Sequence, residues 1–166
     1  MSLQQLSERL REHFTVGFVH AVEWRGDLAI TVTRDKLHEV AQFLRDDPAM
    51  DFDYIVHVSS VDWPDDPERF EVVYEFYSIR KRHRIRLKTR APESDCIVDS
   101  LTDLWKGADF MEREVYDMMG IRFRRHPDLR RILMPDDYTE GYPLRKDFPV
   151  RGKGWRDTFE FLDETR

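Results

Sequence analysis

Residues 70–90 carry the pattern that most restricts the fold of this chain, because apolar and charged side chains alternate there with a period of two. Alternation of this kind is typical of β-strands that bury one face and expose the other. The sequence therefore predicts antiparallel strands over Phe70–Ser78 and Arg82–Arg90, joined by a turn over Arg80 and Lys81. The pairs expected in that register are Phe76 with Ile85, Tyr74 with Leu87, Glu75 with Arg86 and Glu71 with Arg90.

The basic strand of this hairpin also suggests a nucleic-acid surface, since seven Lys and Arg residues fall between Arg80 and Arg90. Other observations favour a different interpretation. Opposed glutamates neutralise part of the stripe, no Phe, Tyr or Trp lies within it to stack on a base, and the chain has a formal net charge of -6. We therefore expect a sheet face covered by another protein, and no nucleic-acid partner.

The remaining elements follow from apolar spacing and from turn residues. The first predicted elements are a helix at 3–10 with a capping box of Ser2 and Gln5, and strands at 16–24 and 28–33 around a turn at Gly26-Asp27. A helix at 37–44, capped by Thr33 or Asp35, and a strand at 52–60 come next and lead into the hairpin. After the hairpin we expect a helix capped by Ser94 that carries Ile97, Val98, Leu101, Leu104 and Trp105, and then a helix capped by Asp109 that ends at Gly120.

This order predicts an α+β fold: a two-layer sandwich with a mixed sheet of about five strands packed by helices, followed by an irregular, proline-punctuated C-terminal arm. A chain of 166 residues is long enough to bury one sizeable core, which favours a single domain overall. We expect the α+β domain over residues 1–120. The arm, over residues 121–166, is expected to pack on that domain and on partners.

Cysteine usage and hydropathy exclude several classes of protein. Cys96 is the only cysteine, which excludes an internal disulfide and any zinc or iron–sulfur site built from several cysteines of this chain. No uninterrupted apolar run exceeds three residues, whereas a helix that spans a membrane needs about 20. The start of the chain also lacks the apolar region of a signal peptide. We therefore expect a soluble protein that is made in the cytoplasm.

The stretch from Glu112 to Pro149 is unusual in charge and in proline content. Between residues 112 and 151 lie nine Lys and Arg, eight Asp and Glu, and four of the eight prolines. Proline at this frequency excludes a long helix or a central strand. Yet the stretch keeps apolar anchors that a disordered tail would lack: Leu129, Ile132, Leu133, Met134, Tyr138, Tyr142, Leu144 and Phe148. Such an arm fits recognition of a partner through arginines and aromatics, or wrapping around its own domain, and both can hold.

A metal-dependent enzyme is a second hypothesis for this stretch. The candidate ligands are Glu112, Glu114, Asp117, His126 and Asp128. Spacing argues against it, because Glu112 and Glu114 stand two residues apart on a helix and point to different sides. We instead expect Arg113 to pair with Asp117 or Glu114. The chain also lacks a nucleophile elbow and a phosphate-binding loop, so we expect no catalytic, cofactor or metal residue on it.

Several runs of residues resemble the signature of the thirty-kilodalton subunit of respiratory complex I, which is the C subunit of the bacterial NADH:quinone oxidoreductase. They are Glu112-Arg113-Glu114, Asp117-Met118-Met119-Gly120-Ile121, His126-Pro127-Asp128-Leu129-Arg130-Arg131-Ile132-Leu133 and Gly141-Tyr142-Pro143-Leu144-Arg145-Lys146-Asp147-Phe148-Pro149. The run Val61-Asp62-Trp63-Pro64 and the hairpin resemble the family too, so the likeness covers most of the chain. Arg125 stands where a glycine is usual, and Met119 where Phe is common.

The resemblance implies a cofactor-free structural and assembly subunit in a complex that uses FMN, iron–sulfur clusters, NADH and quinone and that pumps protons. It implies contact with the D subunit, the forty-nine-kilodalton protein of that complex, and with neighbouring iron–sulfur subunits, on the cytoplasmic side of the bacterial inner membrane. The alternatives are an equivalent subunit of a membrane-bound hydrogenase or of a dehydrogenase with another electron donor, and the stand-alone metal-dependent enzyme that uses Glu112, Glu114 and His126.

Residue roles carried by the resemblance are expectations of two kinds. The structural residues of the signature are Glu112, Arg113, Glu114, Asp117, Gly120, His126, Pro127, Asp128, Arg130 and Arg131. The expected partner-binding residues are Arg130, Arg131, Tyr142, Pro143, Leu144, Arg145, Lys146, Asp147 and Phe148. We expect charge reversal at Arg145 to weaken assembly more than it lowers the melting temperature of the isolated domain, since exposed charges contribute little to stability.

Overall fold

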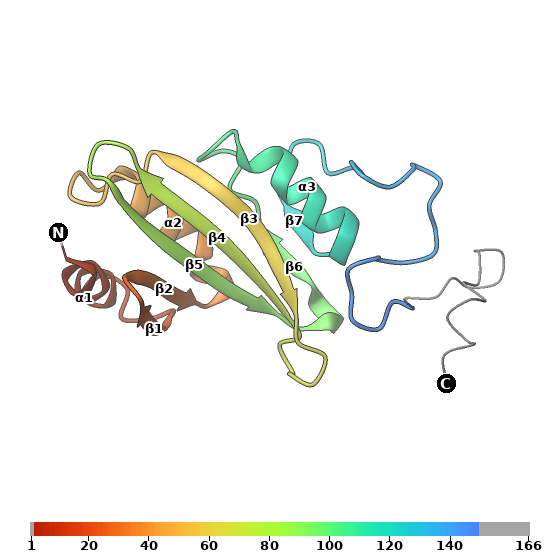
Figure 1. Ribbon diagram of the computed structural model, residues 1–166, viewed down its shortest axis with the longest axis horizontal. Helices are drawn as coiled ribbons and strands as arrows, with labels where there is room; N and C mark the ends of the chain where they lie inside the picture. Colours follow the sequence, from red (N-terminus) through yellow and green to blue (C-terminus); the bar gives the residue numbers. More distant parts are fainter. Residues whose placement is uncertain (1, 150–166) are drawn as a thin grey trace, which may run out of the picture.

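The computed structural model describes residues 2–149 and contains a five-stranded mixed sheet with the order β1-β2-β5-β4-β3 (Figure 1). Neighbouring strands are antiparallel except β2 and β5, which run parallel. The elements are α1 (Leu3–His13), β1 (Phe18–Trp24), β2 (Asp27–Val32), the 3-10 turn η1 (Arg34–Lys36), α2 (Leu37–Asp46), β3 (Tyr54–Asp62), β4 (Phe70–Ser78), β5 (His83–Ala91), the 3-10 turn η2 (Glu93–Asp95), β6 (Ile97–Asp99), α3 (Ala108–Met119) and β7 (Arg122–Arg124).

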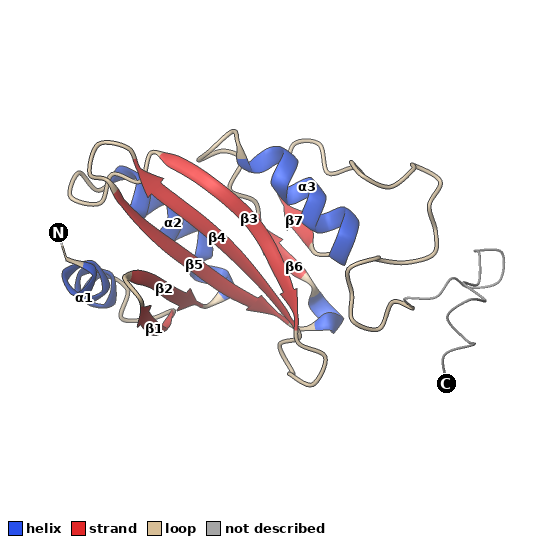
Figure 2. Cartoon of the chain, viewed as in Figure 1, coloured by secondary structure: helices blue, strands red, loops and turns tan. Residues whose placement is uncertain are grey.

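Helices pack against the sheet, and the predicted α+β class is confirmed. In Figure 2, α2 lies behind β4 and β5, and α3 runs beside β3. The core includes fully buried Tyr74, Phe70 and Phe76 on one face of β4, together with Phe52. The arm continues from β7 as irregular chain, and residues 150–166 of the predicted arm lie outside the described residues. Within residues 2–149, no helix combines the length and the apolar character needed to cross a membrane.

The register predicted for the β4–β5 hairpin is confirmed. Tyr74 pairs with Leu87 and Glu75 with Arg86, and the other predicted pairs also face each other. The turn is longer than predicted: the strands end at the pair Ser78 and His83, and four residues connect them. Alternating side chains fix the register because a slip of one residue would turn the apolar set away from the core.

Turn and cap residues were predicted with mixed success. The capping box of Ser2 and Gln5 on α1 is confirmed, with both reciprocal hydrogen bonds present. The β1–β2 turn lies one residue earlier than predicted, because Arg25 and Gly26 both have positive φ angles, of 50° and 82°. This conformation matches the tight hairpin turn that glycine favours. The helix at 37–46 begins directly after η1, so neither predicted side-chain cap is used.

The predicted helix capped by Ser94 is wrong. Ser94 lies in the 3-10 turn η2, and Ile97 and Val98 lie in β6, which pairs in parallel with β7. Leu101 and Trp105, which suggested helical spacing, are buried in the turns that follow. Apolar side chains at those positions fill the core from turns as well as they would from a helix. The β6–β7 pairing joins two segments that the whole of α3 separates in the sequence.

Helix α3 begins and ends close to the predicted positions. It starts at Ala108 with Gly107 at the N-cap, so Asp109 lies in the first turn rather than capping the helix. Its end at Gly120 is confirmed: this glycine has a φ of 75°, in the left-handed region where a helix commonly stops.

Candidate functional site

Helix α3 buries three charged side chains, Glu112, Arg113 and Asp117, and each of them forms hydrogen bonds with a segment outside the helix. Glu112 accepts hydrogen bonds from the Ser100 hydroxyl at 2.7 Å and from the Leu101 backbone N–H at 2.8 Å. Burial raises the pKa of Glu112 to about 7, although these hydrogen bonds oppose the rise. The carboxyl group thus fastens α3 to the turn after β6.

His126 packs beside Glu112 with its side chain fully buried. Its Nε2 lies 3.2 Å from the Asp109 carbonyl oxygen and 4.0 Å from Oε2 of Glu112, while its Nδ1 accepts the backbone N–H of Asp128 at 3.1 Å. An Nδ1 that accepts leaves the ring proton on Nε2, which faces the Asp109 carbonyl. The ring therefore ties the loop after β7 to the first turn of α3.

The structure brings together two of the three residues of the metal hypothesis. Glu112 and His126 are neighbours, but Glu114 is exposed and lines a different hollow, between α3 and β3. Across residues 2–149, no group of three or more His, Cys, Asp or Glu side chains is arranged to hold a metal ion. The described residues therefore give this hypothesis no support.

Arg113 pairs with neither Asp117 nor Glu114, so that prediction is wrong. Its Nε and Nη2 donate to the backbone carbonyls of Arg130 and Arg131, at 3.2 Å and 3.1 Å. The guanidinium group donates to two successive backbone carbonyls of the arm. A carboxylate on its own helix does not provide this pair of acceptors.

Asp117 binds the same part of the arm from the other side. Its Oδ2 accepts the backbone N–H groups of Ile132, Leu133 and Met134 at 3.0, 2.8 and 2.8 Å, and its Oδ1 accepts Nη1 of Arg131 at 2.6 Å. Burial alone would raise the pKa of this carboxyl group, but these hydrogen bonds hold its pKa below the usual value. We call residues 130–134, which Arg113 and Asp117 hold by the backbone, the strap.

A second segment of the arm closes over the C-terminal end of α3. The Leu144 backbone N–H donates to the Met118 carbonyl at 3.1 Å, and Nε of Arg145 donates to the Met119 carbonyl at 2.7 Å. Both carbonyls belong to the last turn of α3, where backbone oxygens have no partner within the helix. The arm therefore supplies donors to two carbonyls at the C-terminal end of α3, next to the C-cap Gly120.

Arg145 lies close to two aromatic rings. Its guanidinium carbon lies 4.7 Å from the ring centre of Phe70 and 4.5 Å from that of Tyr142, a distance suited to cation–π attraction. Tyr142 in turn lies against Gly120, where an added Cβ would stand 2.4 Å from Cε2 of Tyr142. Gly120 is thus required by its backbone conformation and by the close approach of the arm.

Asp62 and Arg69 form a buried clasp that the sequence prediction missed. Arg69 donates to both carboxylate oxygens of Asp62, at 2.7 and 2.8 Å, and the Lys146 backbone N–H donates to Oδ2 at 2.8 Å. The hydrogen bonds from Arg69 lower the pKa of the Asp62 carboxyl group, and the hydrogen bond from Lys146 adds a smaller effect in the same direction. Arg69 also reaches Asp147 at 3.0 Å. A signal existed in the sequence: Asp62 places a carboxylate on the core-facing side of β3, which predicts a buried partner.

The predicted partner-binding residues divide into two groups. Arg131 and Arg145 bind their own domain, and Tyr142, Pro143 and Phe148 are half-buried, whereas Arg130, Leu144, Lys146 and Asp147 are exposed. Within the strap, Leu133 is 61% exposed and Ile132 36% exposed. The arm thus wraps its own domain by backbone and arginine contacts and leaves an outer row of apolar and basic side chains.

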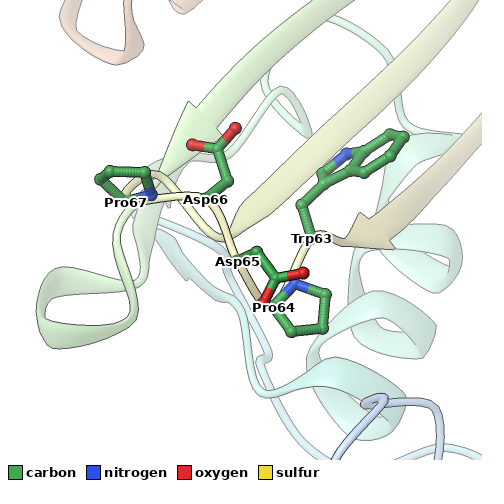
Figure 3. Close-up of a pocket in the computed structure, with 5 residues that line it drawn as sticks. All are labelled: Trp63, Pro64, Asp65, Asp66 and Pro67. Atoms are coloured by element: carbon green, nitrogen blue, oxygen red, sulfur yellow. The ribbon is translucent and has the colours of Figure 1, made fainter.

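A separate hollow lies in the β3–β4 loop, lined by Trp63, Pro64, Asp65, Asp66 and Pro67 (Figure 3). Figure 3 shows the Trp63 and Asp66 side chains projecting away from Pro64. Both meet Arg90: its guanidinium carbon is 5.6 Å from the Trp63 ring centre, and it forms an ion pair with Asp66. Asp66 is therefore already engaged, and the hollow offers no cluster of acid and base groups.

Comparison with known proteins points to one family. Residues 30–154 match the model of the family described as respiratory-chain NADH dehydrogenase, 30 Kd subunit. The C subunit of NADH-quinone oxidoreductase from Geobacter sulfurreducens is 43% identical over 145 residues, which cover 87% of this chain and 88% of that protein. The corresponding C subunit from a Roseiflexus species is 45% identical over 152 residues, which cover 92% of this chain and 87% of that protein.

Solved structures share the fold. A trypsin-resistant fragment, residues 1–134, of Nqo5 superposes with a TM-score of 0.67 and 33% identity, over 78% of this chain and 100% of the fragment. A chain of an archaeal respiratory membrane complex, the membrane-bound sulfane sulfur reductase, superposes with a TM-score of 0.74 over 97% of this chain and 89% of that one. Its identity of 22% shows likeness of fold alone.

Proposed function

We propose, from the premise that this chain belongs to the 30 Kd subunit family of respiratory-chain NADH dehydrogenase, that it is a structural and assembly subunit of a proton-translocating NADH:quinone oxidoreductase. In this proposal the chain holds no redox cofactor of its own. It contacts the D subunit and neighbouring iron–sulfur subunits through the arm, on the cytoplasmic side of the bacterial inner membrane.

The arrangement of the arm is the observation that carries this proposal. Asp117 and Arg113 hold the strap by its backbone, so that the side chains of Ile132 and Leu133 remain available for contact with another protein. Leu133 and Leu144 are 61% and 59% exposed. Apolar side chains rimmed by arginine and lysine are common at the centre of protein interfaces.

The chemistry of the single cysteine supports the cofactor-free part of the proposal. Burial raises the pKa of the Cys96 thiol to about 11, which disfavours the thiolate that binds iron or zinc. Metal analysis and the visible spectrum of the purified chain test this part. We expect no stoichiometric iron or zinc and no visible absorption band; either one would favour the metal-dependent alternative instead.

Charge reversal in the arm tests the proposed contact with the D subunit. The double variant Arg130→Glu and Lys146→Glu changes exposed side chains and should reduce co-purification of that subunit. Lys81→Glu is the matched control, because Lys81 is exposed in the β4–β5 turn, at the end of the molecule away from the arm (Figure 1). Equal recovery of the D subunit with all variants would contradict the proposed contact.

The subunit composition of the native complex tests the identity of the parent enzyme. A complex that contains NADH-oxidising subunits is the expected result. Hydrogenase subunits, or subunits specific to another electron donor, would instead identify a related complex that uses an equivalent subunit.

A further inference from the structure

Strand β1 forms one margin of the five-stranded sheet, with β2 as its only strand neighbour among the described residues (Figure 1). In an antiparallel pair, only alternate residues bond the neighbouring strand, so the other backbone N–H and C=O groups of β1 point away from β2. Across residues 2–149, no other element makes a backbone hydrogen bond to β1. Helix α1 packs near β1 without a backbone hydrogen bond to it, and α3 runs beside β3 at the opposite margin.

Large apolar side chains gather on this free margin. Val19, Val22 and Trp24 in β1 are 56%, 51% and 67% exposed, and Val16 just before the strand is 73% exposed. Val22 pairs with Ala29, which pairs in turn with Arg86 of β5, so Val22 extends a row across the sheet. Exposed apolar residues that stand singly need no explanation, but a group of them on one edge strand indicates a contact surface.

β1 lacks two of the usual protections of a free edge, although Glu23, which pairs with core-facing Leu28, is a charge of a protective kind. Natural edge strands carry lysine or proline, or are twisted away by bulges. The sequence of β1, FVHAVEW, contains neither lysine nor proline. Its register is irregular only between Phe18 and His20, which leaves Ala21–Trp24 regularly paired with β2 and open on the other side.

We propose that β1 is the docking edge for an extended strand of another subunit, so that the sheet gains a sixth strand in the assembled complex. The unpaired backbone groups select a β-strand as the occupant, because only an extended backbone satisfies them in series. We expect that strand to carry apolar side chains on the face that lies beside Val22 and Trp24. On its other face we expect a lysine or arginine beside Glu23. This inference rests on the proposed function, which supplies the neighbouring subunit.

A second copy of this chain fits the margin less well than a strand of a different subunit. The seven residues of β1 span roughly 23 Å, so pairing of two such edges buries far less than the approximately 1,200 Å² of a stable interface. A strand from a subunit that is already held in the same complex needs little contact area, because its effective concentration is high.

Site-specific cross-linking in the assembled complex tests the proposal. A photo-reactive amino acid in place of Val22 should form a cross-link to an extended segment of a different subunit. The same residue in place of Ile79, which is 61% exposed in the β4–β5 turn, is the control and should give no such product. A product that joins two copies of this chain, or no product at all from Val22 in a complex that contains the chain, overturns the proposal.

Oxidative footprinting and a charged variant give independent readouts. Trp24 should be oxidised several-fold more slowly in the complex than in the isolated chain. The double variant Val22→Lys and Trp24→Lys should lower incorporation into the complex several-fold, with little change in the melting temperature of the isolated chain. If Trp24 is oxidised at the same rate in both states and the double variant co-purifies normally with the complex, the docking edge is refuted and the proposed function remains intact. Failure of the wild-type chain to co-purify with the complex would refute both.

Discussion

Asp117 and Arg131 form an ion pair, with Oδ1 and Nη1 2.6 Å apart, that joins the last turns of α3 to the strap. The Asp117 side chain is fully buried and that of Arg131 is 19% exposed. Three backbone N–H groups of the strap share the same carboxylate. The strap therefore depends strongly on the buried carboxylate of Asp117, and this dependence can be measured.

Asp117→Ala is expected to destabilise the chain by about 3–5 kcal/mol, because it leaves Arg131 and the backbone N–H groups without their acceptor. Chemical denaturation of the isolated chain measures the change, and limited proteolysis should show earlier cleavage within the strap. Asp128→Ala is the control. Asp128 pairs with Arg130 on the surface, so its loss should cost no more than about 1 kcal/mol. Similar losses in both variants would contradict the role assigned to Asp117.

Gly120→Ala should destabilise the chain more than Gly26→Ala. Both glycines have positive φ angles, but a Cβ at Gly26 meets nothing within 4 Å, whereas at Gly120 it meets Tyr142 at 2.4 Å. The Gly26 variant should therefore show only the backbone cost of about 1–2 kcal/mol. The further loss at Gly120 measures displacement of the arm, and adding Tyr142→Ala should recover part of it. Equal free energies of unfolding for the two glycine variants would argue against a tight arm.

Stability should fall between about pH 4.5 and pH 7 because of Glu112. Burial raises its pKa in the folded chain to about 7, above the unfolded value of 4.5, so the folded state holds a proton that the unfolded state has lost. This contribution is fully present below the unfolded pKa and is lost as the pH rises through the folded pKa, by about 3 kcal/mol in all. Glu112→Gln should flatten the profile of unfolding free energy in this window. An unchanged profile would show that Glu112 is ionised in the folded chain.

Arg145→Glu is expected to lower the melting temperature of the isolated chain, because Arg145 is not the exposed charge that the sequence prediction assumed. Its side chain is 17% exposed, contacts two aromatic rings and donates to the Met119 carbonyl. Loss of these contacts should cost at least about 2 kcal/mol. Arg130→Glu, at a side chain that is 68% exposed, should leave the melting temperature nearly unchanged. Calorimetry of both variants tests the ranking.

Local pattern predicted much of the sheet. The β4–β5 register follows from alternation alone, because the pairs Tyr74–Leu87 and Glu75–Arg86 satisfy packing and charge together. The stretch carrying Ile97 and Leu101 was misread as a helix, because its apolar spacing suits a helix equally well. The stretch forms a strand because β6 pairs with β7. That pairing joins residues before and after α3 in the sequence, so no local pattern signals it.

The candidate site shows the same limit. Arg113 was assigned Asp117 or Glu114 as its partner, whereas Arg113 and Asp117 both bind backbone groups of the strap. Backbone carbonyls and N–H groups look alike at every position of a sequence, so no residue pattern can reveal which of them a side chain will reach. The clasp of Asp62 and Arg69 is a side-chain pair that the core-facing position of Asp62 could have indicated, but the contact from Lys146 uses a backbone N–H and has no such signal.

Because Asp117 binds Ile132 and Leu133 through their peptide groups, the domain depends little on which side chains these two residues display. Ile132 and Leu133 could be exchanged for other residues while Asp117 keeps the same hydrogen bonds, since every residue except proline supplies the same N–H group. Mutations at these positions can therefore follow changes in a neighbouring subunit without disturbing the fold. The strap separates the requirement for a stable fold from the requirement for a matching surface, and the two can evolve independently.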